Sequence, residues 1–314
     1  MTFQTSMVYQ LCSLRNALRA SGVIFSVIIF LILTNVFKNI YGLMEMNVNE
    51  KEFQALDLLN YGELQKTVQS LPPQYGVILL NRHALDMTLN WLCNTLQMEV
   101  HERILFFVLD EAARQGLKRH YPYLKVVQWN APSLQKPFRP YDSTYMSFFL
   151  MRTNLIQALQ HFGKEFWMLQ ADTIWREPIF PHFNESLKGD ILLDQQGYAD
   201  TAESSVRKRM MNGANFLVST KESSRKLVSL WLSWQKWVYI TDPDVIKMLC
   251  LSGDFNCEFI PHQLISGWEW IYGDQRNPPI MIQMDGETEG NKMTTKNVTS
   301  TLCKGHSGML SNHK

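Results

Sequence analysis

Two aspartates stand where apolar, strand-like runs of this sequence end. Asp172 follows closely after the run 166–169, and Asp194 closes the run that begins at Ile191. Ligands of open α/β sheets bind beyond the carboxyl ends of the strands, so a carboxylate placed there meets a ligand rather than packed side chains. Such a group can hold a divalent cation, orient a substrate or take a proton. We therefore predict that Asp172 and Asp194 are catalytic residues.

Each aspartate also has a structural explanation. Asp172 can cap the turn before Trp175 and Pro178, with no ligand involved. Asp194 can close an Asx-turn where a loop begins. The sequence leaves both explanations open.

The elements that would position these aspartates alternate along the chain. Apolar runs are separated by stretches typical of helices, which predicts βαβ units, a parallel sheet and right-handed crossovers. The expected strands are 76–80, 104–109, 125–129, 166–169, 191–194 and 215–219, and the expected helices are 86–98, 111–119, 143–161, 222–238 and one after Asp242. The first half of the chain is therefore typical of a Rossmann-like fold.

Several segments resemble the nucleotide-diphospho-sugar transferase family, glycosyltransferases of GT-A type, and especially its nematode-like members. Gln-Ala-Asp-Thr-Ile-Trp at 170–175 resembles the strand and Asp-x-Asp region of that family. The other similar segments, in the family's order, are 76–80, 90–93, 106–110 and 212–216. The resemblance covers about 75–286.

This resemblance implies a fold and an activity. The fold is α/β, with a GT-A-like, Rossmann-type mixed and mostly parallel sheet flanked by helices. The activity is transfer of a sugar from a nucleotide-diphosphate donor to a glycan or protein acceptor, usually with Mn²⁺ or Mg²⁺. A cation held by carboxylates would offset the negative charge of the departing nucleoside diphosphate.

The resemblance also assigns metal and donor ligands. Asp172 matches the second Asp of the family motif, whereas position 170 carries Gln where many members carry Asp. The Gln170 carbonyl can coordinate a cation or bind a ribose hydroxyl, but it has no formal charge to retain the metal. Asp285 stands roughly where the family supplies a last metal or phosphate contact, although a turn-forming Asp-Gly is the simpler explanation. Gln170, Asp172 and Asp285 are the expected metal ligands, and the first two also contact the donor.

Residues 212–215 form the other expected donor-binding segment. A small-residue loop with Gly213 lets backbone amides and the side chains of Asn212 and Asn215 approach a sugar, and an ordinary tight turn is the alternative. Asp194 would orient the donor sugar or the acceptor hydroxyl.

Three tryptophans recur at a spacing of three residues in an expected helix. They are Trp231, Trp234 and Trp237. This spacing indicates core packing first and a sugar-stacking platform second.

An uncharged segment, 20–37, lies near the N-terminus. As a helix it would span about 27 Å, close to the thickness of a thin bilayer. No Ala-x-Ala-like site follows, so a signal-anchor is favoured over a cleaved signal peptide or a buried helix. Arg15 and Arg19 precede the span and acidic residues follow it, which places the N-terminus in the cytosol.

We therefore expect a single-pass type II protein of the Golgi or endoplasmic reticulum membrane. The expected segments are a cytosolic tail (1–19), a transmembrane anchor (20–37), a stem (38–72), a lumenal transferase domain (73–290) and a C-terminal tail (291–314).

Two sequons fit a lumenal domain. Asn184 and Asn297 each begin an Asn-x-Ser/Thr acceptor, which is modified only in the secretory pathway. Four cysteines would lie on the oxidising side and permit one or two disulfides of open pairing: Cys93, Cys250, Cys257 and Cys303. Cys93 can equally be a small buried apolar residue.

Composition excludes some classes of function. The net charge is +1, with one short basic cluster at 207–209, so we expect no nucleic-acid partner. The run ending at Leu80 is not followed by Gly-x-Gly-x-x-Gly, which argues against a dinucleotide-dependent oxidoreductase. The alternative to an enzyme is a catalytically inactive glycan-binding or scaffolding protein of the same fold, and Gln170 is its main support.

Overall fold

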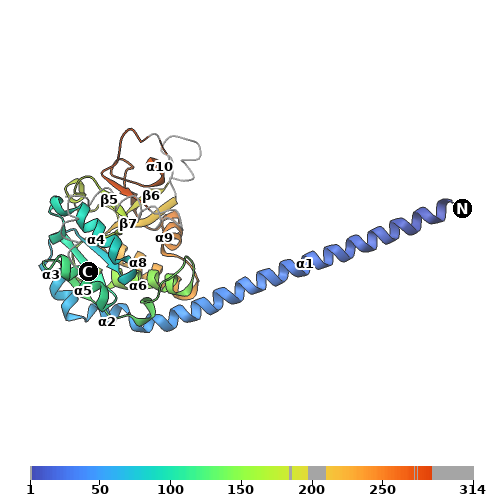
Figure 1. Cartoon of the computed structure of the whole chain (residues 1–314), viewed down its shortest axis with the longest axis horizontal. Helices are drawn as coiled ribbons and strands as arrows, with labels where there is room; N and C mark the ends of the chain where they lie inside the picture. The colour runs from blue at the N-terminus through green and yellow to red at the C-terminus, as the bar shows by residue number, and fades with distance from the viewer. Residues whose placement is uncertain (1, 184–185, 197–209, 272, 274, 285–314) are drawn as a thin grey trace, which may run out of the picture.

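The computed structural model describes residues 2–183, 186–196, 210–271, 273 and 275–284, and shows one long helix that extends from an α/β domain (Figure 1). The helices are α1 (Thr2–Asn49), α2 (Ala55–Leu59), α3 (Gly62–Ser70), α4 (Leu85–Asn94), α5 (Glu111–His120), α6 (Ser143–Gln160), α8 (Glu222–Trp237), α9 (Asp242–Leu251) and α10 (Trp268–Ile271). The strands are β1 (Tyr75–Leu80), β2 (Ile104–Val108), β3 (Lys125–Gln128), β4 (Phe166–Leu169), β5 (Thr173–Trp175), β6 (Ile191–Gln196), β7 (Met210–Val218), β8 (Cys257–Phe259), β9 (Ile265–Ser266) and β10 (Met281–Gln283).

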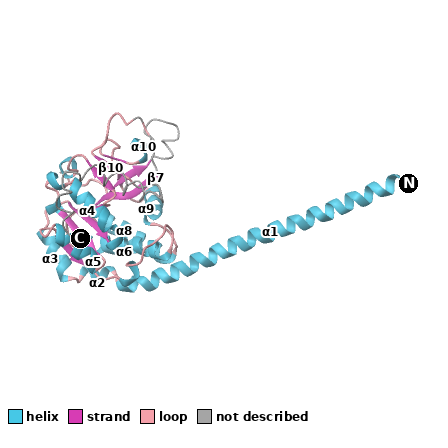
Figure 2. Cartoon of the chain, viewed as in Figure 1, coloured by secondary structure: helices cyan, strands magenta, loops and turns pink. Residues whose placement is uncertain are grey.

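A seven-stranded sheet forms the centre of the domain, in the order β3-β2-β1-β4-β7-β6-β8. Strand β7 is antiparallel to both of its neighbours, and the other pairs are parallel. Helices pack on the sheet, as Figure 2 shows. Strands β1, β2 and β4 are almost entirely apolar, as is typical of parallel strands covered on both faces; all five residues of β2 are buried. The mixed, mostly parallel sheet and its flanking helices are therefore confirmed.

The sheet has its topological switch point between β1 and β4. The chain runs from β1 outward to β2 and β3, then returns through α6 to place β4 on the other side of β1. The carboxyl ends of β1 and β4 thus lie side by side, which is where open α/β sheets bind ligands. Asn81 and Gln170 are the first residues beyond these two ends.

Strand β7 contains a wide bulge opposite β6. Leu193 pairs with Phe216 and Gln195 pairs with Met211, so Asp194 alone faces residues 212–215. The sequence indicates a loop before a strand here, whereas the structure continues the strand through the bulge. Gly213 has φ +67°, a conformation that glycine adopts at little cost. Bulges of this kind re-aim backbone groups and occur next to active sites.

A second, three-stranded sheet begins just after the end of β4. Its order is β5-β10-β9, with β5 and β10 antiparallel. Its strands are two or three residues long, too short to be recognised from alternation in the sequence. The sheet joins the turn after β4 to residues 281–283.

Residues 38–72, which the sequence indicates as a stem, fold against the domain from Gly42 onward. Met46, Phe53, Leu58 and Leu64 are fully buried in the same core cluster as Tyr75 of β1. Most polar residues of this segment are exposed or partly exposed, with Glu50 buried, so an average composition hides an amphipathic pattern.

The N-terminal part of α1 contacts no other element in Figure 1. Its apolar side chains from Ile24 to Phe37 are exposed. Within the described part of the chain, this is the one helix whose length and composition suffice to cross a membrane.

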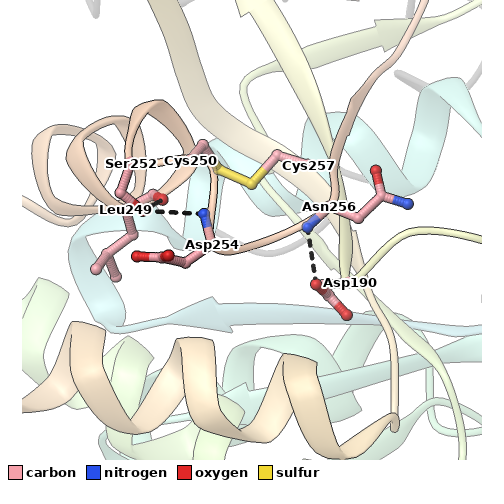
Figure 3. Close-up of a disulfide and its surroundings, with 7 residues drawn as sticks. All are labelled: Asp190, Leu249, Cys250, Ser252, Asp254, Asn256 and Cys257. Carbon is pink, nitrogen blue, oxygen red and sulfur yellow. Dashed lines mark hydrogen bonds between the residues drawn. A yellow bond between two sulfur atoms is a disulfide. The ribbon is translucent and has the colours of Figure 1, made fainter.

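A disulfide fixes the loop between α9 and β8 (Figure 3). Cys250 and Cys257 are joined, with Cα atoms 5.7 Å apart. Asp190, just before β6, accepts a 2.9 Å hydrogen bond from the Asn256 N–H and one from the Ser223 hydroxyl. Cys93 is also disulfide-bonded, so it is not simply a buried apolar residue.

Candidate active site

The carboxylate of Asp194 is held by backbone N–H groups of the β7 bulge. Its Oδ1 accepts from the Ala214 N–H at 3.2 Å, its Oδ2 accepts from the Asn215 N–H at 2.7 Å, and the Gly213 N–H contributes a further hydrogen bond. The side chain is 1% exposed. Burial raises the pKa of Asp194 to about 7, and the hydrogen bonds from residues 213–215 oppose that rise. A carboxyl group of this kind is poised to change protonation near neutral pH.

Asn215 extends this arrangement to the end of β4. Its side-chain nitrogen lies 3.3 Å from Asp194 Oδ2 and 2.5 Å from Gln283 Oε1. Its side-chain oxygen accepts from the Gln170 N–H at 3.1 Å. Gln283 in turn donates to Gln170 Oε1 at 3.3 Å. A continuous polar network therefore links the ends of β4 and β10 and Asp194 of β6 with the bulge of β7.

Asp172 joins the same network through Gln283. It lies in the turn between β4 and β5, and the residue as a whole is partly exposed. The Gln283 side chain donates a hydrogen bond to its carboxylate, and the Met284 N–H donates to its main-chain oxygen at 3.0 Å. Desolvation raises the pKa of Asp172, and the bond from Gln283 opposes the rise. Asp172 is therefore a partly exposed residue whose backbone is fixed and whose carboxyl group is largely removed from water.

A buried ion pair supports the bulge from α6. Arg152 is the only charged residue of α6, and it pairs with Asp242 at the start of α9, with 2.6 Å from Nε to Oδ2. A guanidinium nitrogen of Arg152 also donates to the Gly213 carbonyl at 2.9 Å. A Cβ on Gly213 would lie 2.8 Å from Pro243 Cγ, so α9 also limits the size of this residue. The ion pair thus fixes the loop whose N–H groups hold Asp194.

The structure brings together four of the residues singled out from the sequence: Gln170, Asp172, Asp194 and Asn215. Gly213 and Asn212 belong to the bulge, and Asn212 is partly exposed. Asp285, Asn184 and Asn297 lie outside the described residues.

Two members of this site are missed by the sequence analysis. Gln283 ends the apolar run from Ile280, which is the same signal that singles out Asp194. Arg152 is one cation in an otherwise uncharged helix, and a buried cation needs a partner. Both signals are visible in the sequence, but their partners are not.

The described part of the chain offers few ligands for a metal ion. Within the residues described, no group of three or more His, Cys, Asp or Glu side chains is suited to a metal ion. The Gln170 side-chain oxygen accepts one hydrogen bond from Gln283, at 3.3 Å, and has no formal charge. Among the expected metal ligands that the structure describes, Asp172 supplies the carboxylate, and one carboxylate suffices for Mg²⁺ or Mn²⁺ where substrate phosphates supply further oxygens.

A protein-family comparison identifies the family of this chain. The model of the nucleotide-diphospho-sugar transferase family matches residues 99–295, which include every described member of the network. The chain belongs to this family. It is accordingly a glycosyltransferase that depends on a nucleotide sugar, and the strand-end network is its candidate active site. No curated protein matches the chain.

Solved glycosyltransferases are similar to this transferase at the level of the chain trace. The galactosyltransferase LgtC, in complex with donor and acceptor sugar analogues, is 14% identical, with a TM-score of 0.46, over 72% of this chain and 96% of its own. Mouse xyloside xylosyltransferase 1 is 12% identical, with a TM-score of 0.46, over 68% of this chain and 98% of its own. At this similarity we transfer no substrate and no residue role.

Proposed function

We propose that this transferase is a membrane-anchored lumenal enzyme that binds a sugar nucleotide at the carboxyl ends of β1 and β4 and passes the sugar to a glycan or protein acceptor. The observation that carries this proposal is the hydrogen-bonded network of Asp194, Asn215, Gln283 and Gln170, with Asp172 at its partly exposed edge. The network reaches the end of β4, which is one side of the switch point between β1 and β4, where such folds bind ligands.

Asp172 and Asp194 take different roles because their surroundings differ. Asp172 is partly exposed and is assigned to the diphosphate side of the donor. Asp194 is buried and held by several N–H donors, so its orientation is fixed before the substrate arrives. We assign it to the donor sugar or the acceptor hydroxyl, where a preorganised carboxylate stabilises developing positive charge or accepts a proton.

A divalent cation fits this site as a partner of the donor. Asp172 would hold it together with the diphosphate oxygens, and Gln170 would add only an uncharged amide oxygen, which already accepts a hydrogen bond from Gln283. When bound, the metal supplies charge to the leaving diphosphate. We therefore propose that metal binding is weak in the free protein and strengthens with nucleotide.

Three features support a lumenal domain in the Golgi or endoplasmic reticulum. The exposed apolar part of α1 is suited to a signal-anchor, and the arginines before it favour a cytosolic N-terminus. The disulfide between Cys250 and Cys257 is typical of an oxidising compartment. The sequons at Asn184 and Asn297 would then be available for glycosylation.

The test is turnover with a panel of donors. Purified full-length protein is mixed with UDP- and GDP-sugars and Mn²⁺, and the release of nucleotide is measured with and without acceptor glycans. We expect one donor to be hydrolysed slowly alone and faster with its acceptor. A glycan-binding protein without activity would be stabilised thermally by a glycan and would release no nucleotide from any donor.

A further inference from the structure

Four apolar or aromatic side chains form an exposed patch near the junction of α1 and the domain. Trp237 is 80% exposed, Tyr141 63%, Val238 43% and Trp234 37%. We call these residues the junction patch. Of the three regularly spaced tryptophans, Trp231 alone is buried, so the other two are not core residues. Large aromatic side chains exposed together are characteristic of an interaction surface.

The patch is fixed relative to α1 by direct contacts. The Asn47 side chain donates to the Lys236 carbonyl at 3.2 Å, and Lys236 Nζ pairs with Glu50 at 2.7 Å. The Tyr239 ring packs on Gly42 so closely that a Cβ there would lie 2.6 Å from it. The chain from Lys236 to Tyr239 therefore moves from the level of residue 47 to that of residue 42, which is toward the apolar part of α1.

Tyr141 continues this path. Its carbonyl accepts a 3.0 Å hydrogen bond from the Tyr239 hydroxyl, and its ring packs against Tyr145 of α6, with centroids 6.1 Å apart. The loop that carries Tyr141 and the end of α8 thus lie together at the side of the domain from which α1 leaves (Figure 1). Trp237 and Val238 lie between the two fixed points, Lys236 and Tyr239.

The point at which the patch contacts α1 gives the depth of the patch in a membrane. The uncharged segment ends at Phe37, and Gly42 is five residues further on, a rise of about 7.5 Å. The polar layer on each side of the hydrocarbon core is about 5–8 Å thick. The level of Gly42, and with it Tyr239, therefore falls within the headgroup layer, where Trp and Tyr side chains are enriched.

We propose that the junction patch rests in the headgroup layer of a zwitterionic bilayer and fixes the orientation of the transferase domain on the membrane. This inference rests on the proposed anchoring by α1. Apolar burial of amphipathic rings drives the contact, so it needs no anionic lipid. The enzyme would then act on acceptors held close to the membrane and not on acceptors along a long tether.

The distribution of tryptophan allows a direct test. Residues 1–49 contain no Trp, so quenching of Trp fluorescence by lipid reports on the domain alone. The full-length protein is inserted into phosphatidylcholine vesicles, with or without bromine on the acyl chains near the headgroup, and co-flotation with the vesicles is measured in parallel. We expect brominated lipid to quench part of the fluorescence. Trp234→Phe/Trp237→Phe should lose most of that quenching and still float.

Trp270→Phe is the matched control, because α10 lies far from the α1 junction (Figure 1). This variant should keep the quenching of the wild type. Flotation of the wild type without quenching, or equal quenching in the double variant, would contradict the proposed contact of the junction patch with the membrane. Either result would still be consistent with anchoring by α1. Failure of the wild type to float would contradict both the anchoring by α1 and this inference. The proposed transferase activity would be unaffected, because the donor panel tests it separately.

Discussion

Asn215 donates two hydrogen bonds to one oxygen of Asp194, from its backbone N–H at 2.7 Å and from its side chain at 3.3 Å. The same side chain contacts Gln283 and accepts from the Gln170 N–H. Asn215 is fully buried, so water cannot replace these partners without rearrangement. One residue of the β7 bulge thereby connects Asp194 of β6 with the residues at the ends of β4 and β10.

Replacing Asn215 with Ala should destabilise the protein. The change leaves the Gln170 N–H and the Gln283 side-chain oxygen without a partner, and it should lower the free energy of unfolding by about 1–3 kcal/mol. Urea denaturation measures the difference. Asn256→Ala, at an exposed position in the disulfide loop, should change it by less than about 0.5 kcal/mol. Equal effects of the two substitutions would contradict the network.

The raised pKa of Asp194, about 7, predicts opposite pH dependences of stability and activity. An unfolded Asp titrates near pH 4, so between about pH 4 and 7 the folded chain binds more protons than the unfolded one. The contribution of Asp194 to stability is therefore favourable below about pH 4 and is lost as the pH rises toward 7. Activity needs the carboxylate and should fall below about pH 7.

Asp194→Asn provides the measurement for stability, because other carboxyl groups, such as Asp242, are common to both proteins. The free energy of unfolding of the wild type minus that of the variant should decrease from pH 4 to pH 7. A difference that is constant or increases with pH would show that Asp194 titrates normally.

The ion pair of Arg152 and Asp242 predicts that stability and activity can be separated. Burial raises the pKa of Asp242 to about 6, and Arg152 opposes that rise. Arg152→Met leaves a buried carboxylate unpaired and should cost about 3–5 kcal/mol of folding free energy. Arg152→Met/Asp242→Leu should regain most of this stability but not turnover, because the Gly213 carbonyl still lacks its donor. A fully active double variant would refute the supporting role of Arg152.

Removal of residues before 73 should unfold the domain. Met46, Phe53, Leu58, Leu64 and Val68 are fully buried, and each contributes about 1.5–3 kcal/mol. Their sum is comparable to the whole stability of a typical domain, about 5–15 kcal/mol. A chain that starts at Gly42 should show a cooperative unfolding transition, and one that starts at residue 73 should not. Indistinguishable transitions would contradict the packing of this segment.

Much of the fold follows from local pattern. The continuous apolar runs predict β1 to β4 to within a residue or two, because buried parallel strands need no polar face. The structure places Asp194 inside β6, two residues before its end at Gln196, and Asp172 three residues beyond the end of β4. The hydrogen-bond partners of the two aspartates come from distant parts of the sequence. Two of these partners, Asn215 and Gln283, are 68 residues apart and contact each other.

Other features depend on tertiary structure. The bulge of β7 exists because one residue of β6, Asp194, collects the N–H groups of several residues, and no periodicity encodes that register. The segment 42–71 is polar on average, and only its packing partners reveal which side chains are buried. The pairing of Cys250 with Cys257 likewise needs the proximity of α9 and β8.

The central claim is that the partly exposed edge of the network, Asp172, takes part in transfer from the sugar nucleotide. The most direct test is the turnover number of wild type, Asp172→Asn and Asp254→Asn with the best donor and acceptor at saturating Mn²⁺, where Asp254 is an exposed control. Asp172→Asn should lose at least about 100-fold in turnover while remaining folded, and Asp254→Asn should match the wild type. Undiminished turnover in Asp172→Asn would contradict the proposed site.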